Sequence, residues 1–474
     1  MEAKKIVSGV KWTSIQFVIG TAFRFSIKLI LAKLLLPEEF GLVGMCSIFI
    51  AVASAASEIG MSAALIQREN DDEVLPMYST AFWTGIGWGL VVFAIMSVLI
   101  GPFAANFYGQ PRLIQLIPVL SIGILIKPFG MIHTVILTRR MDFKVITKAL
   151  NIAVLIAGVI AIISGFLGAG VWALVVNNAL APILALPTLF SATNWKPKIE
   201  WKKDQFKSIF GFGAYSSGTQ IFSTLTYNVD NLLIGKMLGS SLLGTYTLAF
   251  SLTEQVRQTV SSVLNKVMYP VFGKHQQNKG VLRKYFLNIV HLNAIMLYPL
   301  MGFMMLFANE IVLFFGAEWV GAVIPLQLLS LAIMIHLMVN SFGSIIRGIG
   351  KPKLEMKIIM GLTCFILIPG LIIGITKFGL VGAAVAILIN KLALSITGMI
   401  VLKKHIGLSA KELLGVLVNP VLAVAISSVC VYILKNTIAN VGFFIPAVVF
   451  LVISYGSIVV KEKDNLFKLV KLMA

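Results

Sequence analysis

The sequence has few charged residues for its length. Only 12% of its 474 residues are Asp, Glu, Lys or Arg, whereas a soluble domain carries about 25%. Acidic residues are the scarcer kind, 19 against 39 basic ones, and 58% of the chain is hydrophobic. The mean hydropathy of +0.94 excludes a soluble domain and, despite an isoelectric point near 9.8, argues against nucleic acid as a partner. We therefore expect an integral membrane protein.

Cysteines and enzyme motifs are also scarce. Cys46, Cys364 and Cys430 lie inside apolar runs without CxxC spacing, which excludes a disulfide framework and a thiolate metal site. HExxH and the phosphate-binding GxxxxGK[ST] motif are absent, and the similar stretch Gly348–Pro352 lacks the required spacing. The five histidines are scattered, so we interpret them as packing or surface residues. We expect no metal, no cofactor and no ATP hydrolysis, and favour a transporter over an enzyme.

Long apolar runs fill most of the chain. They are too long for barrel strands, which alternate over about 10 residues, and about 20 apolar residues suffice for a membrane-crossing helix. We predict fourteen spans, over approximately 12–36, 41–66, 78–104, 113–137, 146–165, 169–191, 208–235, 242–270, 285–307, 321–346, 356–376, 379–402, 414–434 and 440–460. The predicted fold is all-α, a polytopic membrane protein. The first run contains Arg24 and Lys28, unlike a signal peptide, so we expect it to remain as a span.

The basic residues divide unevenly among the predicted loops. With a cytoplasmic N-terminus, 28 of the 39 Lys and Arg residues fall in cytoplasmic segments, five in outer loops and six within spans. Because cytoplasmic loops are enriched in Lys and Arg, this distribution predicts that both termini are cytoplasmic. All loops are short, which places the function within the bilayer or at its faces.

Short motifs recur along the chain. ILAKLL at 30–35 and Phe40-Gly41 return 203 residues later as LIGKML at 233–238 and Leu243-Gly244. Leu167-Gly168 matches Phe378-Gly379 at an offset of 211. Each repeat holds six predicted spans, an even number that keeps the repeats parallel. We predict two six-helix lobes related by a pseudo-twofold axis, residues 1–195 and 196–405, followed by an extra helix pair and a basic cytoplasmic tail in 406–474.

Ionisable residues inside spans are the candidates for function, because a charge at the bilayer centre is costly. Arg24 and Lys28 are four residues apart, so they share one helical face, and no carboxylate lies within a turn. This pattern indicates an anionic ligand or a water-filled cavity. In the second repeat Asn231 matches Lys28, and its neighbour Asp230 is a candidate counter-ion, ion-coupling group or gate.

Glu254 and Arg257 are three residues apart in a later span. Either they neutralise each other, or Arg257 binds substrate while Glu254 couples an ion or acts as a gate; the spacing leaves both interpretations open. Lys127, Lys391 and Glu58 are isolated, and whether they line a cavity is also open. Six cations against three anions within the spans favour an anionic substrate over a cationic one.

Several stretches resemble a known family. LAKLLLPEEFGLV at 31–43, EIGMSAALIQ at 58–67, GVWALV at 170–175 and RGIGKP at 347–352 are similar to Wzx-type polysaccharide flippases. These belong to the multidrug/oligosaccharidyl-lipid/polysaccharide (MOP) exporter superfamily, and the sequence resembles its colanic-acid and teichuronic-acid exporter-like branch. The resemblance covers essentially the whole chain, including the helix count and the two lobes.

The resemblance implies a flippase of the bacterial cytoplasmic (inner) membrane. Its implied substrate is undecaprenyl-pyrophosphate-linked oligosaccharide, moved by alternating access for capsule, exopolysaccharide or O-antigen synthesis. A pyrophosphate suits the paired cations Arg24 and Lys28. Membrane lipids, H+ or Na+ and the polysaccharide polymerase machinery are further candidate partners, with Asp230 and Glu254 as candidates for the ion.

Three alternatives remain open. A multidrug/cation antiporter of the same superfamily would favour an acidic cavity, which the excess of intramembrane cations argues against. A membrane polysaccharide polymerase or ligase enzyme would carry a large outer loop, whereas the outer loops here are short. A lipid-bound scaffold without transport leaves Arg24 and Lys28 unexplained.

Overall fold

A computed structural model of the chain describes residues 19–57, 60–68, 74–208, 221, 223–437 and 442–473. Within these ranges the regular structure is helical and no strand occurs, which confirms the all-α prediction. A helix over 19–34 is followed by α2 (Pro37–Ser57), α3 (Met61–Gln67), α5 (Met77–Ile95), α6 (Gly101–Tyr108), α7 (Leu113–Arg139), α8 (Phe143–Phe166), α9 (Val171–Ser191) and α11 (Val229–Phe250). The later helices are α12 (Val256–Lys274), α13 (Lys279–Leu306), α14 (Ala308–Phe315), α15 (Val323–Leu337), α16 (Phe342–Gly348), α17 (Pro352–Leu362), α18 (Ile368–Ile406), α19 (Ala410–Thr437) and α20 (Phe444–Met473).

Eleven helical runs among the described residues are long and apolar enough to cross a membrane. Large apolar side chains stay exposed on them, for example Phe166, Ile400 and Val460, as expected of surfaces that face lipid rather than water. These features indicate a multi-pass membrane protein. The number fourteen stays a prediction, because several of the eleven runs contain a break and the first predicted span begins outside the described residues.

Two of these breaks occur at glycines: Gly239 lies between two predicted spans, and Gly379 is the first residue of one. Gly239 inside α11 has φ 83, and Gly379 inside α18 has φ 57 and ψ −136. Gly170, which precedes α9, has nearly the same conformation as Gly379, with φ 57 and ψ −132. A side chain disfavours this region of backbone space, so glycine is the residue that can begin a new helix there. By backbone conformation Gly379 corresponds to Gly170. The repeated sequence motif aligns it instead with Gly168, two residues earlier.

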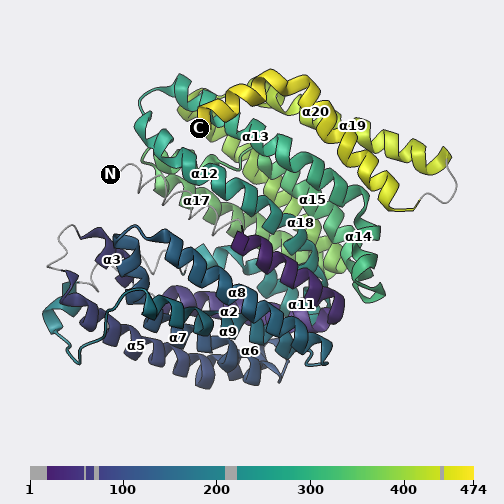
Figure 1. The fold of residues 1–474 in the computed structure, drawn as a ribbon. Helices are drawn as coiled ribbons and strands as arrows, with labels where there is room; N and C mark the ends of the chain where they lie inside the picture. The colour runs from purple at the N-terminus through teal and green to yellow at the C-terminus, as the bar shows by residue number, and fades with distance from the viewer. Residues whose placement is uncertain are drawn as a thin grey trace. The chain divides into compact units, whose positions relative to one another are not determined.

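The chain forms two compact units, Met1–Thr247 (unit 1) and Leu248–Ala474 (unit 2). In unit 1, α7 packs against α2, α5, α6 and α9, and α8 lies along α9 (Figure 1). The helix over 19–34 packs closely on α8, because a Cβ atom at Gly158 would lie 2.0 Å from the Ile27 side chain. Small residues allow such close helix contacts in membranes. The predicted division at residues 195 and 405 stays a prediction.

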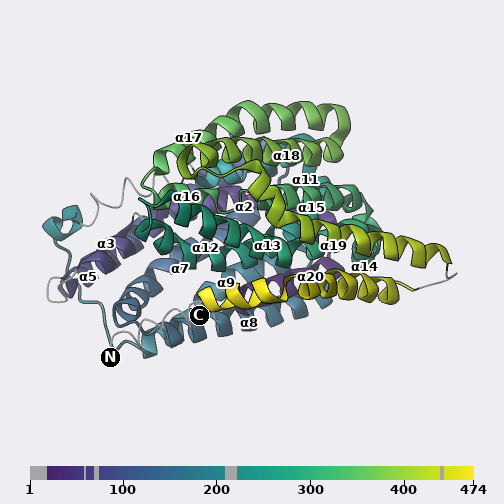
Figure 2. The same cartoon turned by 90° about the horizontal axis from the view of Figure 1, so that it is seen from above.

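In unit 2, α13 is the central helix. It contacts α12, α15, α18, α19 and α20, and its buried residues Phe286 and Tyr298 belong to the main hydrophobic cluster. The last two helices, α19 and α20, run side by side (Figure 2). One polar contact between these helices and α13 is made by His291, whose Nε2 lies 2.6 Å from Glu462 Oε2. This buried contact fits the predicted packing role of the histidines.

Candidate functional site

Arg24 and Lys28 lie on the described helix over 19–34, so they share a face as predicted. Arg24 is exposed and Lys28 is half-buried, while Ile27 between them packs on α8. A Cβ atom at Gly20 would meet the Asn151 Oδ1 atom at 2.6 Å and the Arg24 guanidinium at 3.2 Å. Because Gly20 has no side chain, the Arg24 guanidinium and the Asn151 amide, which come from two helices, both fit beside it. No pattern in the sequence pointed to Asn151, which comes from α8.

Asp230 lies near the start of α11 and is 8% exposed. Its Oδ2 atom accepts a hydrogen bond of 2.5 Å from the Tyr246 hydroxyl, and its Oδ1 atom accepts one of 2.9 Å from the Asn231 backbone N–H. Tyr246 follows Asp230 by 16 residues, which in a straight helix would be about 24 Å. The break at Gly239 therefore folds the helix back and brings the phenol to the carboxylate.

Asn231, the residue matched to Lys28 in the repeat, is half-buried beside Asp230. The Asp230 carboxylate and the Asn231 amide thus occupy neighbouring positions on α11. The roles of Asn231 in substrate binding and of Asp230 as counter-ion stay predictions.

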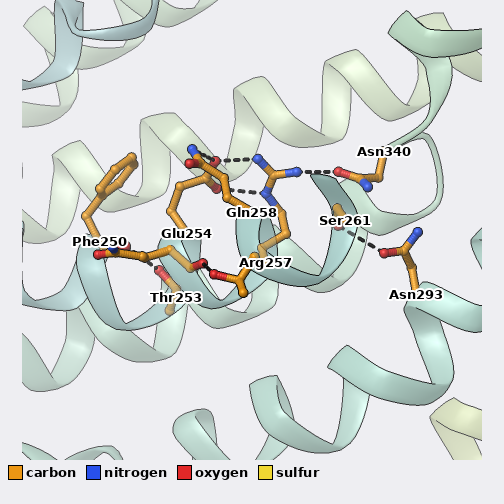
Figure 3. Close-up of polar contacts among 10 residues, drawn as sticks. Phe250, Thr253, Glu254, Arg257, Gln258, Ser261, Asn293 and Asn340 are labelled. Atoms are coloured by element: carbon orange, nitrogen blue, oxygen red, sulfur yellow. Dashed lines mark hydrogen bonds and ion pairs between the residues drawn. The ribbon is translucent and has the colours of Figure 1, made fainter. Parts of the chain in front are cut away.

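Glu254 and Arg257 form a buried ion pair in unit 2 (Figure 3). Arg257 Nε donates to Glu254 Oε2 at 2.9 Å, and its Nη2 donates to Oε1, so the contact is bidentate. Gln258 Nε2 donates to the same Oε1 at 3.1 Å. The side chains of Glu254 and Arg257 are 11% and 13% exposed. Bidentate hydrogen bonds between charged groups, such as these, are among the stronger hydrogen bonds in proteins.

Arg257 is also anchored from a second segment. Its Nη1 donates to Asn340 Oδ1, on the turn between α15 and α16 (Figure 3). Glu254 itself lies in a five-residue π-helical segment, Ser251–Gln255, that interrupts the α-helix just before Arg257. Such π-bulges are rare and frequently mark functional sites. The structure thus confirms the pairing and adds Asn340, which sequence spacing does not connect to either residue.

Further polar contacts follow along α12, after the Glu254–Arg257 pair. Ser261 Oγ donates to Asn293 Oδ1 at 2.9 Å (Figure 3). Ser341 Oγ donates to Asn265 Oδ1 at 2.8 Å. Asn293 is fully buried. The run Val229–Ser261 is the least apolar of the eleven. This is a sequence signal that could have pointed to Gln258 and Ser261 as well as to the charged residues, but not to Asn293 or Ser341, which lie outside the run.

Three further polar atoms in unit 2 are buried without a hydrogen-bond partner among the residues that the structure describes. They are His336 Nδ1, Asn340 Nδ2 and Asn390 Oδ1. Lys391 follows Asn390 on α18. Buried polar atoms are normally paired, so these groups are suited to a polar ligand. Sequence reasoning missed them because it assigned His336 to packing.

The remaining candidates are dispersed. In unit 1 the Lys127 ammonium on α7 lies 3.5 Å from the Ser54 hydroxyl on α2. Glu58 lies outside the described residues. No group of three or more His, Cys, Asp or Glu side chains that could hold a metal ion occurs in the described part of the chain.

Comparison with known proteins gives relatives over most of the chain. It is 27% identical over 365 residues to the teichuronic acid biosynthesis protein TuaB of Bacillus subtilis, covering 74% of this chain and 73% of TuaB. It is 25% identical over 410 residues to the lipopolysaccharide biosynthesis protein WzxC of Escherichia coli, covering 85% and 82%. The succinoglycan biosynthesis transport protein ExoT of Rhizobium meliloti is 23% identical over 352 residues, covering 74% and 71%.

Solved structures share the fold. An inward closed conformation of the lipid II flippase MurJ matches with a TM-score of 0.73 at 15% identity, covering 97% of this chain and 100% of MurJ. An inward-facing multidrug resistance MATE family transporter of the MOP superfamily matches with a TM-score of 0.64 at 16% identity, covering 82% and 94%. These likenesses confirm the resemblance to the superfamily at the level of fold. The family model described as "Polysaccharide biosynthesis protein" matches residues 30–324, more than half of the chain. The chain therefore belongs to this polysaccharide biosynthesis protein family.

Proposed function

We propose that the protein is a flippase that moves undecaprenyl-pyrophosphate-linked oligosaccharide units across the bacterial cytoplasmic membrane by alternating access. Family membership, the relatives that serve in polysaccharide biosynthesis and transport, and the fold shared with a lipid II flippase support this proposal. The observation that carries it is the pair of cations, Arg24 and Lys28, on one helical face in an otherwise apolar run. Two adjacent cations suit a pyrophosphate, which carries several negative charges.

The proposed roles follow from the chemistry of each group. Arg24 offers a planar fork of donors for one phosphate, and Lys28 adds a point charge on the next turn. Asn231 contributes an uncharged amide in unit 1. In unit 2, Arg257 with the unpartnered atoms of His336 and Asn340 offers hydrogen bonds to sugar hydroxyls. A lipid-linked oligosaccharide needs both kinds of contact, ionic for its pyrophosphate and neutral for its sugars.

We assign different roles to the two buried carboxylates. Glu254 is already engaged by Arg257 and Gln258, so an ion could reach it only by displacing Arg257. This arrangement favours a gate that opens when the pair separates. Asp230 accepts from a neutral phenol and a backbone N–H, which makes it the better candidate to couple H+ or Na+.

The multidrug/cation antiporter is the second candidate, supported by the fold shared with the MATE transporter. The two candidates differ in substrate charge, and the intramembrane residues are mostly cationic. An antiporter should confer drug resistance and leave lipid-linked intermediates unchanged. A flippase should change the distribution of the lipid-linked intermediates and confer no drug resistance.

The test uses Arg24→Ala, Lys28→Ala and the double variant in a deletion strain. Each cation removed should weaken substrate binding by about 10- to 100-fold, the value of a hydrogen bond to a charged group. Lipid-linked oligosaccharide should then accumulate in the inner leaflet, as measured by its protection from an externally added glycosidase. Lys33→Ala removes one charge from the same helix and serves as the matched control.

Normal export by the double variant would refute the assignment of these cations. Unpolymerised units accumulating outside the deletion strain would instead favour a polymerase or ligase. Membrane levels of each variant, measured by immunoblot, separate loss of transport from loss of protein.

A further inference from the structure

A hollow of about 360 Å³ lies where three loops of unit 2 meet. The loops join α12 to α13, α16 to α17, and α18 to α19, and the positive-inside distribution predicts that all three face the cytoplasm. The polar side chains that line the hollow are Gln276, Gln277, Lys279, Lys351, Lys404 and His405. Its size falls within the range of small-molecule sites, about 300–1,000 Å³.

No carboxylate lines this hollow. The acidic residues closest in sequence are engaged elsewhere, Glu355 with Arg347 at 3.0 Å and Glu412 with Arg283 at 3.5 Å. Lys279, Lys351 and Lys404 form neither an ion pair nor a hydrogen bond through their ammonium groups with any described residue. Three like charges thus line one small space without compensation. The positive-inside rule explains lysines in each loop, but not their convergence on a hollow that lacks carboxylates.

Two of the three lysines stand at helix N-termini. Lys279 is the first residue of α13, and Lys351 is the residue just before α17. A helix N-terminus carries partial positive charge, so a cation there is unfavourable and an anion is favourable. The first turn of α13 has no acidic residue, and its cap is the neutral Asn278 side chain, which accepts from the Val281 N–H at 3.1 Å. The first turn of α17 already holds Glu355, so an anion bound in the hollow would offset the lysine charges and the dipole of α13.

We infer that this hollow, defined by Lys279, Lys351 and Lys404, is a binding site for a phosphate-bearing anion at the cytoplasmic face of unit 2. The two glutamine amides add neutral donors of the kind that phosphate oxygens accept. The phosphate group has two sources at this face, the headgroup of an anionic phospholipid or a soluble pyrophosphate compound. The inference goes beyond the proposed flippase activity, because it uses none of the residues assigned to transport.

The test compares the full-length protein with two triple variants. Lys279→Gln/Lys351→Gln/Lys404→Gln removes the three lining charges. Lys284→Gln/Lys353→Gln/Lys403→Gln removes three exposed lysines from the same segments that do not line the hollow, and it is the matched control. Inorganic pyrophosphate, titrated calorimetrically into protein in neutral detergent, probes the soluble source. Native mass spectrometry of protein from mixed phosphatidylglycerol and phosphatidylcholine nanodiscs, which counts retained lipids, probes the lipid source.

The expected result is that the affinity of the lining variant for pyrophosphate, its retention of phosphatidylglycerol, or both fall by about tenfold or more, while the control variant matches wild type. Loss of pyrophosphate binding alone identifies the soluble source, and loss of phosphatidylglycerol retention alone identifies the lipid. Equal loss in both triple variants would show that only general surface charge matters and would overturn the site, as would wild-type protein that binds neither probe. If the lining variant does not elute as wild type does in size-exclusion chromatography, the three single variants replace it. Each is expected to show a smaller loss of probe binding than the triple variant.

Discussion

Gly41 on α2 and Gly244 on α11 lie at a helix crossing in which each glycine faces the backbone of the other helix. A Cβ atom at Gly41 would lie 1.7 Å from the Ser240 carbonyl oxygen, and one at Gly244 would lie 1.7 Å from the Pro37 carbonyl oxygen. At the repeat offset of 203 residues, Pro37 corresponds to Ser240 and Gly41 to Gly244. The two contacts are therefore related as in an isologous interface, in which residue i meets j and j meets i. This reciprocity supports the internal repeat.

Gly41→Ala and Gly244→Ala should destabilise the protein to a similar extent. A backbone carbonyl cannot rotate aside as a side chain can, so the helices must separate, at about 1–3 kcal/mol for overpacking. Thermal unfolding in detergent measures the loss. Gly87→Ala on α5 is the control, because no atom lies within 4 Å of the added Cβ, and its stability should be unchanged or slightly higher. If Gly41→Ala is as stable as the wild-type protein, α2 and α11 do not approach each other closely at this crossing.

The sequence predicted those features of the fold that depend on local pattern. Gly239 interrupts a helix between two predicted spans, and Gly379 interrupts one where a predicted span begins. Such boundaries can be predicted because apolar runs and glycine punctuation are visible along the chain. Arg24 and Lys28 share a face because helical spacing alone decides it. Helical periodicity also allowed the Glu254–Arg257 contact without requiring it.

Contacts between distant segments could not be predicted in the same way. Tyr246 reaches Asp230 only because α11 folds back at Gly239, and nothing in the spacing of 16 residues indicates a contact. Asn340 and Asn390 lie on segments brought together by the packing of α15 against α18. Periodicity tells which face of a helix is polar, but not which helix that face meets.

The Glu254–Arg257 pair should behave as a coupled unit in a double-mutant cycle. Glu254→Gln or Arg257→Gln alone leaves a buried charge without its partner, which costs about 3–5 kcal/mol. The double variant removes both charges and should recover most of that loss. Thermal unfolding of the three variants gives the coupling energy. Losses that simply add would contradict a buried pair, since additive effects are typical of residues that do not interact.

Tyr246→Phe should destabilise unit 1 by about 1–3 kcal/mol, because the phenol donates to a buried carboxylate and hydrogen bonds to charged groups are the stronger ones. Tyr298→Phe is the matched control. Its hydroxyl donates to the neutral Met334 carbonyl at 3.0 Å, so the expected loss is smaller, about 0.5–1.5 kcal/mol. Chemical denaturation in mixed micelles compares the two. Equal losses would show that Asp230 does not depend on this phenol.

Glu462 connects the last two helices to α13 through two hydrogen bonds. Asn419 Nδ2 donates to Oε1 at 2.7 Å, while His291 Nε2 lies 2.6 Å from Oε2. The other ring nitrogen, Nδ1, donates to the Val416 carbonyl at 2.7 Å. Because Nδ1 already carries a proton, the contact at Nε2 requires one more proton, on either the imidazole or the carboxyl group.

Glu462→Gln should therefore leave stability close to that of wild type, whereas Glu462→Leu should not. The amide oxygen can accept from Asn419, and the amide N–H can donate to the neutral imidazole, so both hydrogen bonds survive the first substitution. The leucine side chain makes neither and leaves the buried Nε2 atom of His291 without its partner, at about 1–3 kcal/mol, with a smaller loss at the half-buried Asn419. Limited proteolysis in the segment between α18 and α19, together with thermal unfolding, measures how firmly the helix pair is held. If both variants are cleaved at the same rate, the Glu462 hydrogen bonds contribute nothing, and the other contacts, among them Arg283–Glu412 and the Tyr455 hydroxyl on the Met296 carbonyl, hold α19 and α20 to α13.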